Sequence, residues 1–241
     1  MSYSLFISDL HLDGERPQHV EALGRLLDQH AGKADALYVL GDLFESWVGD
    51  DDDSEFNQSI EQLFRRFAEQ GSALWLMHGN RDFAIGDEYA ARCGGRLLAE
   101  YSVVDLYGQQ ALLLHGDSLC TRDVKYQQFR AMARDPTWQA EMRAKPLAER
   151  RMMAQFIRMQ SKQNHANRAE NIVDVTEEEV VKALEQAGVQ CMIHGHTHRP
   201  AVHQLDTAQG PATRYVLGDW QDTLWLITAD GEGIRLSEQA L

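Results

Sequence analysis

Residues 37–45 read Leu-Tyr-Val-Leu-Gly-Asp-Leu-Phe-Glu. The apolar run predicts a buried strand, and the glycine and aspartate after it predict a turn that places a carboxylate at the strand end. Four further segments end in possible metal ligands: Asp9-Leu10-His11, Gly79-Asn80-Arg81-Asp82, His115-Gly116-Asp117 and Gly195-His196-Thr197-His198. They follow, directly or closely, the apolar runs 5–8, 73–77, 111–114 and 189–193. Because strand ends at one edge of a sheet gather residues from distant parts of an α/β chain, we expect one site.

The residue types in these segments indicate that the site binds metal. Aspartate, histidine and asparagine suit divalent ions such as Mn, Fe, Zn or Mg, and no cysteine lies in the segments. The set has more ligands than one ion needs, so we expect two ions, with Asp42 bridging them. Singly the residues say little, because Asp42 alone would be a common turn former and His11 or His115 an ordinary strand-end histidine. Their joint arrangement supports the interpretation.

In this order the five segments resemble the signature of the calcineurin-like metallophosphoesterase superfamily, which is DxH, GDxx(D/E), GN(H/R)(D/E), H and GHxH. The resemblance implies an α/β fold, a sandwich of two mixed β-sheets flanked by helices. It implies that one metal is held by Asp9, His11, Asp42 and His198. It implies that a second metal is held by Asp42, Asn80, His115 and His196. The catalytic residues that it implies are Asp42, Asn80, Arg81 and His196.

The order of the predicted elements agrees with such a fold. We expect helices at residues 17–30, 55–70 and 176–187. A capping box, Thr176-Glu177-Glu178-Glu179, should open the last helix and Gly188 should end it. We expect β-hairpins formed by residues 101–106 with 110–115 and by residues 224–228 with 233–236. The chain has 241 residues, which suits one domain with an insertion, and we place the core at 1–121 and 170–241 and a helical insertion, or lid, at 122–169.

The insertion differs from the rest of the chain in charge and composition. Residues 122–170 hold eleven Lys or Arg against five Asp or Glu, in a chain whose formal net charge is −14. Five of the eight methionines also lie here: Met132, Met142, Met152, Met153 and Met159. One interpretation is a helical cap whose apolar faces pack on each other. Another is a lid with an adaptable apolar groove that accepts an acyl chain and binds anionic membrane lipid, and the two are compatible.

Several function classes are disfavoured by the composition. The net charge of −14 argues against a nucleic-acid partner. No apolar stretch approaches the ~20 residues that span a bilayer, and the first residues lack the basic start of a signal peptide. The three cysteines, Cys93, Cys120 and Cys191, lie outside every ligand segment and suggest reduced, buried thiols of a cytosolic protein. We interpret the acidic run Asp50 to Asp53 as a solvated loop, because four adjacent carboxylates cannot converge on one ion.

Arg81 departs from the pattern of many superfamily members, which have histidine after the asparagine. Arginine cannot give up its proton at working pH, so it cannot protonate a leaving alkoxide. It can instead hold phosphate oxygens with its two-pronged guanidinium group. The substitution favours a leaving group that departs as an anion, such as a phosphate, and therefore a pyrophosphate linkage.

Arg81, the 41–53 segment and the cationic insertion together resemble the UDP-2,3-diacylglucosamine diphosphatase family of lipid A biosynthesis in Gram-negative bacteria. The resemblance implies hydrolysis to 2,3-diacylglucosamine 1-phosphate (lipid X) and UMP, with two Mn²⁺ ions and hydroxide attack on the α-phosphorus. It implies a peripheral protein on the cytoplasmic face of the inner membrane, and no obligate protein partner is inferred. The substrate-binding residues that it implies are Asn80, Arg81, Asp123, Ser161, Asn164, His165, Arg168 and His196.

Two other functions remain open at this point. A soluble nucleotide or nucleotide-sugar pyrophosphatase would use the same metal site, with the insertion only gating a small substrate. A non-catalytic metal-binding scaffold would keep the fold without turnover. A protein phosphatase fits less well because of Arg81.

Overall fold

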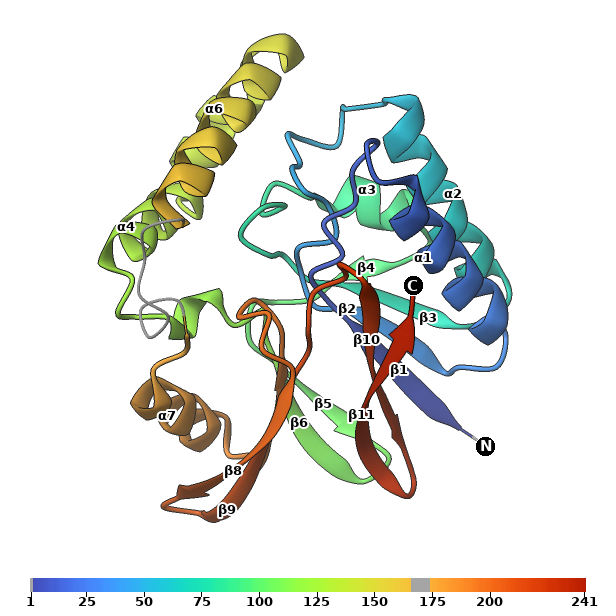
Figure 1. Ribbon diagram of the computed structural model, residues 1–241, viewed down its shortest axis with the longest axis vertical. Helices are drawn as coiled ribbons and strands as arrows, with labels where there is room; N and C mark the ends of the chain where they lie inside the picture. The colour runs from blue at the N-terminus through green and yellow to red at the C-terminus, as the bar shows by residue number, and fades with distance from the viewer. Residues whose placement is uncertain (1, 166–173) are drawn as a thin grey trace.

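The computed structural model describes residues 2–165 and 174–241, without the side chains of residues 160–165. Its strands form two sheets (Figure 1). The six-stranded sheet has the order β11-β10-β1-β2-β3-β4, with β1 at Tyr3–Ile7, β2 at Ala36–Val39, β3 at Ala73–Leu76, β4 at Arg96–Leu97, β10 at Thr223–Asp230 and β11 at Gly233–Ala240. The five-stranded sheet has the order β5-β6-β7-β9-β8, with β5 at Ser102–Leu106, β6 at Gln109–Leu113, β7 at Cys191–His194, β8 at Ala201–Thr207 and β9 at Gly210–Val216.

The sheets pack face to face, and helices cover their outer faces (Figure 1). Phe6, Leu113, Ile193 and Ile227 are buried between the sheets, where each contributes about 1.5–3 kcal/mol. Three helices, α1 (Pro17–His30), α2 (Glu55–Glu69) and α3 (Asp87–Arg92), cover the six-stranded sheet. One helix, α7 (Glu177–Ala187), covers the five-stranded sheet. The predicted α/β sandwich is therefore confirmed.

Local sequence explains where these elements begin and end. Pro17 occupies the first turn of α1, where its missing N–H leaves no hydrogen bond unmade. Gly188 ends α7 in the left-handed conformation, with φ 69°. The capping box was wrong in one respect: α7 begins at Glu177, but the Thr176 hydroxyl makes no cap hydrogen bond. It pairs instead with the Thr121 hydroxyl at 2.8 Å, which ties α7 to the loop after β6.

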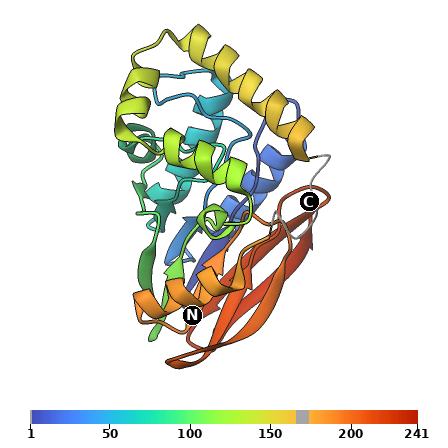
Figure 2. The ribbon, with the colours of Figure 1, turned by 90° about the vertical axis from the view of Figure 1, so that its left-hand side faces the viewer.

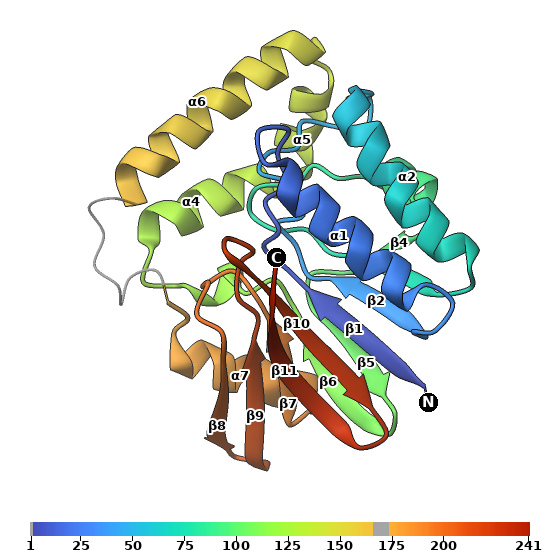
Figure 3. The same ribbon diagram turned by 45° about the vertical axis from the view of Figure 1, so that its right-hand side comes forward.

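The predicted insertion is helical in the described residues. It contains α4 (Val124–Ala133), α5 (Pro136–Arg143) and α6 (Leu147–His165), which we call the cap. Figures 2 and 3 show these helices to one side of the sheets, with α6 reaching over the ends of the strands. The boundaries of the insertion as a separate domain stay a prediction. Among the described residues, no helix is long and apolar enough to cross a membrane.

The acidic run after β2 joins the core to the cap, so its interpretation as a solvated loop holds only in part: Asp51 and Asp53 are exposed, but three of the four aspartates have protein partners. Asp50 accepts hydrogen bonds from the backbone N–H groups at the start of α3, at Gly86 and Tyr89. Asp51 accepts a two-pronged contact from Arg150 of α6, a residue only 4% exposed. Carboxylates that meet a helix N-terminus or a guanidinium group gain charge-assisted hydrogen bonds that water would otherwise supply.

Much of the cationic excess of the cap likewise faces the core. Arg151 pairs with Asp52 at 2.6 Å, and Arg130 contacts Asp117 at 2.9 Å. Arg134 donates to the carbonyl oxygen of Gly79 at 3.0 Å, directly beside a ligand segment. These arginines attach the cap to the sandwich instead of forming an outward cationic surface.

Candidate dimetal site

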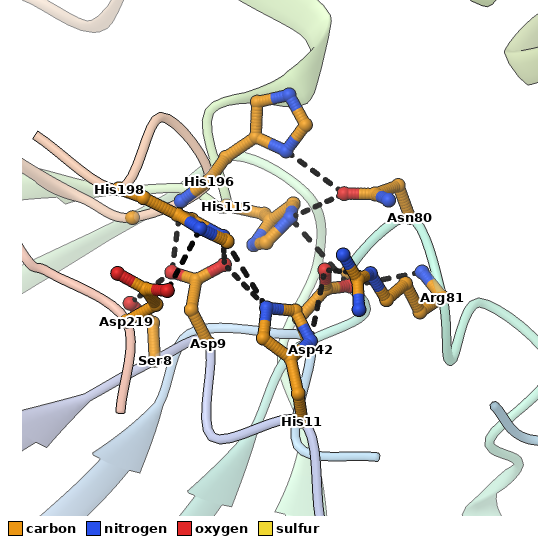
Figure 4. A network of polar contacts seen from close by, with 12 residues as sticks. Ser8, Asp9, His11, Asp42, Asn80, Arg81, His115, His196, His198 and Asp219 are labelled. Atoms are coloured by element: carbon orange, nitrogen blue, oxygen red, sulfur yellow. Dashed lines mark hydrogen bonds and ion pairs between the residues drawn. The ribbon is translucent and has the colours of Figure 1, made fainter. Parts of the chain in front are cut away.

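The five ligand segments meet at one edge of the sandwich, as predicted from their positions after strands. They lie in the loops after β1, β2, β3, β6 and β7, and Figure 4 shows their side chains converging. Backbone hydrogen bonds couple neighbouring loops, because the Asp9 N–H donates to Gly41 O and the His11 N–H to Asp42 O. The backbone hydrogen bonds that pair β1 with β2 therefore continue into the loops and position the ligands.

Backbone strain is concentrated on the predicted ligands. Five of them have positive φ values: Asp9, His11, Asp42, His196 and His198, between 48° and 68°. Among the described non-glycine residues only Tyr107 also has a positive φ. This conformation is uncommon for residues with a Cβ, and it persists where the surrounding structure enforces it, often at functional sites.

Two glycines of the segments allow the loops to approach closely. A Cβ on Gly79 would collide with Asp42 Oδ1, and a Cβ on Gly195 would collide with Asp9 Oδ2. Both clashes would fall on carboxylates of the site. The glycine before Asn80 and the glycine before His196 are therefore required by the packing of the ligands.

The first ligand group consists of Asp9, His11 and His198, whose ligand atoms all lie within 4.8 Å of one another. His11 Nε2 lies 3.2 Å from His198 Nε2, and His198 Nε2 lies 3.5 Å from Asp9 Oδ1. Asp42 Oδ2 lies 3.7 Å from the His11 ring. These are the four residues expected around the first metal.

The second group gathers around Asn80. The Asn80 Oδ1 atom lies 3.0 Å from His115 Nε2 and 2.8 Å from His196 Nδ1. Asp42 Oδ1 lies 3.7 Å from His115 Nε2, while its other oxygen faces His11. Asp42 thus presents one oxygen to each group, which is the arrangement expected of a bridging carboxylate.

The donor set fits a pair of divalent cations. Asp9 Oδ1 and His11 Nδ1 are buried without a hydrogen-bond partner, and a buried polar atom left unpaired costs about 1–3 kcal/mol. A cation among these atoms would remove that penalty. Oxygen and imidazole donors without thiolate suit Mn, Fe, Zn or Mg.

Neighbouring groups fix the orientation of the ligands. Asp9 Oδ2 accepts from Ser8 Oγ at 2.6 Å and from the His196 N–H at 2.9 Å, which leaves Oδ1 for a cation. His115 Nδ1 lies 2.8 Å from the carbonyl of Leu40, so its Nε2 atom faces the site. Such outer contacts set the tautomer and direction of metal-binding histidines.

The ligands differ in protonation state because their surroundings shift their pKa values in different directions. Burial raises the pKa of Asp42 to about 6. Burial and the charge of His115 lower the pKa of His196 to about 3, so its imidazole is neutral. Burial opposes the charge of His198, yet hydrogen bonds to Asp219 and Asp9 raise its pKa to about 10. Because a metal binds neutral imidazole, loading at His198 must release a proton.

Two carboxylates of the site were not predicted. Asp82 is fully buried and accepts from the N–H groups of Leu43 and Gly79, both at 2.7 Å, so it joins two ligand loops. Asp219 lies 3.1 Å from His198 Nδ1 and orients that ring. Asp82 is the last residue of the ligand segment at residues 79–82, which gives a sequence signal for it, whereas Asp219 lies in the loop before β10 with no motif around it.

Arg81 belongs to a cluster at the edge of the metal site. Its guanidinium group contacts Glu45, which also accepts from Arg158 of α6. Arg16 lies 3.8 Å from the same carboxylate. We call Arg16, Glu45, Arg81 and Arg158 the Glu45 cluster. Arg81 Nε also lies 3.5 Å from Asp42 Oδ2. The three guanidinium groups outnumber the two carboxylates that they contact, which favours an anionic ligand.

The predicted substrate residues of the cap are placed less fully. Asp123 is buried and its side chain accepts from the Tyr126 N–H, so it caps α4. Ser161, Asn164 and His165 lie in the last turns of α6, and their side chains are outside the described structure. Arg168 lies outside the described residues. The substrate role of these four, and of Asp123, stays a prediction.

Comparison with known sequences connects this geometry to a family. The sequence model of calcineurin-like phosphoesterases matches residues 4–200, a span that contains all five ligand segments. The chain belongs to the calcineurin-like phosphoesterase family. Members are hydrolases with a dimetal centre, so this calcineurin-like phosphoesterase is a hydrolase and the ligand groups around Asp42 are its candidate dimetal site.

Nearly full-length relatives lie within the same family. The phosphoesterase is 49% identical to a UDP-2,3-diacylglucosamine hydrolase of Cellvibrio japonicus, over 97% of both chains. It is 47% identical to a protein of that name from Marinobacter nauticus, over 99% of this chain and 98% of the relative. It is 48% identical to one from Pseudomonas aeruginosa, over 96% of both chains.

Proposed function

We propose that this phosphoesterase hydrolyses the pyrophosphate bond of UDP-2,3-diacylglucosamine in lipid A biosynthesis, giving 2,3-diacylglucosamine 1-phosphate and UMP. The observation that carries the proposal is the 47–49% identity, over nearly the whole chain, to proteins named UDP-2,3-diacylglucosamine hydrolase. The Glu45 cluster supports it, because a diphosphate is the kind of anion that a group of arginines binds.

The residues of the site have distinct roles in this proposal. Asp9, His11, Asp42 and His198 would hold one Mn²⁺, and Asp42, Asn80, His115 and His196 would hold the other. When bound, two such ions neutralise phosphoryl charge and lower the pKa of water. Arg81 binds the diphosphate and steadies the lipid phosphate as it leaves as an anion, which needs no proton from a histidine.

Contacts between cap and core support a lipid substrate. Phe83, two residues after Arg81, packs against Phe129 of α4 and Trp138 of α5, with ring centroids 6.3 and 6.1 Å apart. This aromatic group gives the glucosamine acyl chains an apolar environment next to the dimetal site. The lipid half is then the immobile part of the substrate, and water attacks the α-phosphorus on the UMP side.

The substrate assignment is tested by a turnover screen with added Mn²⁺. We expect the highest kcat/KM for UDP-2,3-diacylglucosamine among that lipid, UDP-GlcNAc, ADP-ribose and p-nitrophenyl phosphate. Equal or higher kcat/KM for UDP-GlcNAc would support a nucleotide-sugar pyrophosphatase instead. Hydrolysis in ¹⁸O-labelled water should place the label in UMP, whereas label in the lipid phosphate would reverse the orientation of the substrate.

We further propose that the protein is peripheral on the cytoplasmic face of the inner membrane, with α6 as its contact. Met152, Phe156 and Met159 are 63%, 57% and 50% exposed and recur at helical spacing along α6. Because many described cap arginines face core carboxylates, these apolar side chains are better suited than cations to make the contact.

Vesicle sedimentation tests this location. We expect Phe156→Ser to weaken binding to anionic vesicles, while Val202→Ser, at a similarly exposed apolar residue of β8, leaves it unchanged. If vesicle binding is lost at high salt and is unchanged by Phe156→Ser, cationic side chains make the membrane contact. No binding at any salt concentration would remove the membrane from the proposal.

A further inference from the structure

A cavity of about 580 Å³ lies between α6 and the loops after β1 and β2. Its volume is within the ~300–1,000 Å³ typical of small-molecule sites. Asp13, Ser46 and Val48 line one side, and Ala154, Gln155 and Met159 of α6 line the other. Figure 3 shows the loop before α1, in dark blue, rising beside α1 on the side where the cap lies. Four of the predicted substrate residues have described side chains, Asn80, Arg81, Asp123 and His196, and none of these four lines the cavity.

The cavity opens beside the dimetal site. Glu45 and Arg158, both of the Glu45 cluster, are part of its wall. Glu45 Oε2 lies 3.9 Å from His11 Nδ1, so the cavity wall is shared with the first ligand group. A phosphate held by the Glu45 cluster would therefore place its substituent at the cavity entrance.

The lining indicates what chemistry the cavity accepts. Outside the Glu45 cluster, the charged side chains of the wall are Arg151, which pairs with Asp52, and Asp13, so this part of the cavity offers no positive excess for a second phosphate. An acyl chain would cover Asp13 and Gln155 without giving their polar atoms a hydrogen-bond partner, which disfavours it relative to a hydroxyl-bearing group. Ser46, Asp13 and Gln155 can hydrogen-bond to hydroxyl and ring amide groups, while Val48 and Ala154 provide apolar surface for a flat ring.

The acyl chains of the proposed substrate have a different site. The aromatic group of Phe83, Phe129 and Trp138 suits the acyl chains, and none of these residues lines the cavity. A neutral, flat, hydroxyl-bearing group attached to the remaining phosphate is a nucleoside. Resting on the proposed function, we infer that this cavity binds the uridine half of the substrate, with the phosphates between it and the aromatic group.

Filling the cavity tests the inference. Ala154→Trp should raise the KM for UDP-2,3-diacylglucosamine and the Kd of UMP at least ten-fold, measured on the Mn²⁺-loaded enzyme. It should change kcat/KM for bis(p-nitrophenyl) phosphate, which has no nucleoside, less than two-fold. Ala148→Trp is the matched control, because Ala148 is an exposed residue of the same helix outside the cavity, and it should change none of these values.

Two smaller substitutions test the same cavity without the risk that a bulky tryptophan distorts the cap. Ser46→Ala and Gln155→Ala should each weaken UMP binding about three- to ten-fold, since each removes one hydrogen bond. Unchanged UMP affinity in both variants and in Ala154→Trp would overturn the uridine site and leave the proposed function standing. The wild type could instead fail to hydrolyse UDP-2,3-diacylglucosamine but bind UMP, with Ala154→Trp weakening that binding. In that case the proposed function fails and the nucleoside site stands.

Discussion

The dimetal site and the cap interface of this phosphoesterase are built in opposite ways. At the site, short side chains project from loops that directly follow hydrogen-bonded strands, and five ligands have strained backbones. At the cap, long arginines such as Arg151 and Arg158 reach across to carboxylates of the core, and α6 leaves Met152 and Phe156 exposed.

This difference separates chemistry from substrate binding. Strand ladders and buried carboxylates hold metal ligands in one arrangement, as metal binding requires. An ion pair between partly exposed side chains, such as Arg151 with Asp52, contributes only about 0–1 kcal/mol, so such pairs hold the cap less firmly than the strand ladders hold the ligands. Changes at the core should therefore affect turnover strongly, and changes at the cap should mainly affect KM and stability.

The largest effect is expected for Asp42→Ala. Loss of the carboxylate that faces both ligand groups removes several kcal/mol of transition-state stabilisation, so kcat should fall on the order of a thousand-fold or more. Metal content, measured by mass spectrometry, should fall with it. Asp105→Ala, at an exposed carboxylate of β5, is the control and should behave as wild type. Near-normal turnover with full metal content in Asp42→Ala would contradict the dinuclear site.

Arg81→His should have the next largest effect. Histidine is mostly neutral at pH 7 and lacks the two-pronged donor, so kcat/KM for the pyrophosphate should fall about a hundred-fold. The shape of the pH–rate profile should change less than its height. Arg66→His on exposed α2 is the matched control. An unchanged kcat/KM would remove Arg81 from substrate binding.

Arg158→Ala should have a moderate effect that distinguishes cap from core. It removes the cap arginine of the Glu45 cluster, so KM should rise about ten-fold while kcat changes little. Arg143→Ala, at an exposed arginine of α5, should leave both constants unchanged. A fall in kcat without a rise in KM would place Arg158 with the chemical step and weaken the comparison.

The smallest effect is expected for Asp51→Asn, in the stability of the cap interface. The hydrogen bond from Arg150 lowers the pKa of Asp51. Because the folded-state pKa is depressed, the stabilisation is present above the unfolded-state pKa of ~3.9 and is lost as pH falls through the lower folded-state pKa. Because the Asp51 side chain is 63% exposed and water screens the pair, the loss should be at most about 1 kcal/mol, so calorimetry at pH 7 should show Tm lowered by no more than about 2–4 °C.

The same experiment at acidic pH provides the check on this mechanism. The difference between Asp51→Asn and wild type should begin to shrink as pH falls below about 4, and it should vanish below the lowered folded-state pKa of Asp51, where both side chains are uncharged. Asp53→Asn, at an exposed carboxylate of the same run, should not change Tm at either pH. A difference that persists at low pH would show that the aspartate acts by its shape and not its charge.

Local sequence determined the strands and the ligands. An apolar run such as 37–40 followed by Gly41 and Asp42 specifies a strand end with a carboxylate, because burial and turn chemistry act within a few residues. The helix at Pro17 and the end of α7 at Gly188 follow for the same reason. Periodicity and capping are local interactions, so they can be predicted without knowing the rest of the fold.

Only the tertiary structure decided the contacts between distant segments. The pairing of Arg150 with Asp51 crosses 99 residues, and Asp219 orients His198 from a loop without any motif. From the sequence, the acidic run looked solvated and the cap looked outwardly cationic, because a charge has no partner until the chain folds. Which carboxylate meets which guanidinium depends on how the cap lies over the sheets, and that arrangement has no local signal.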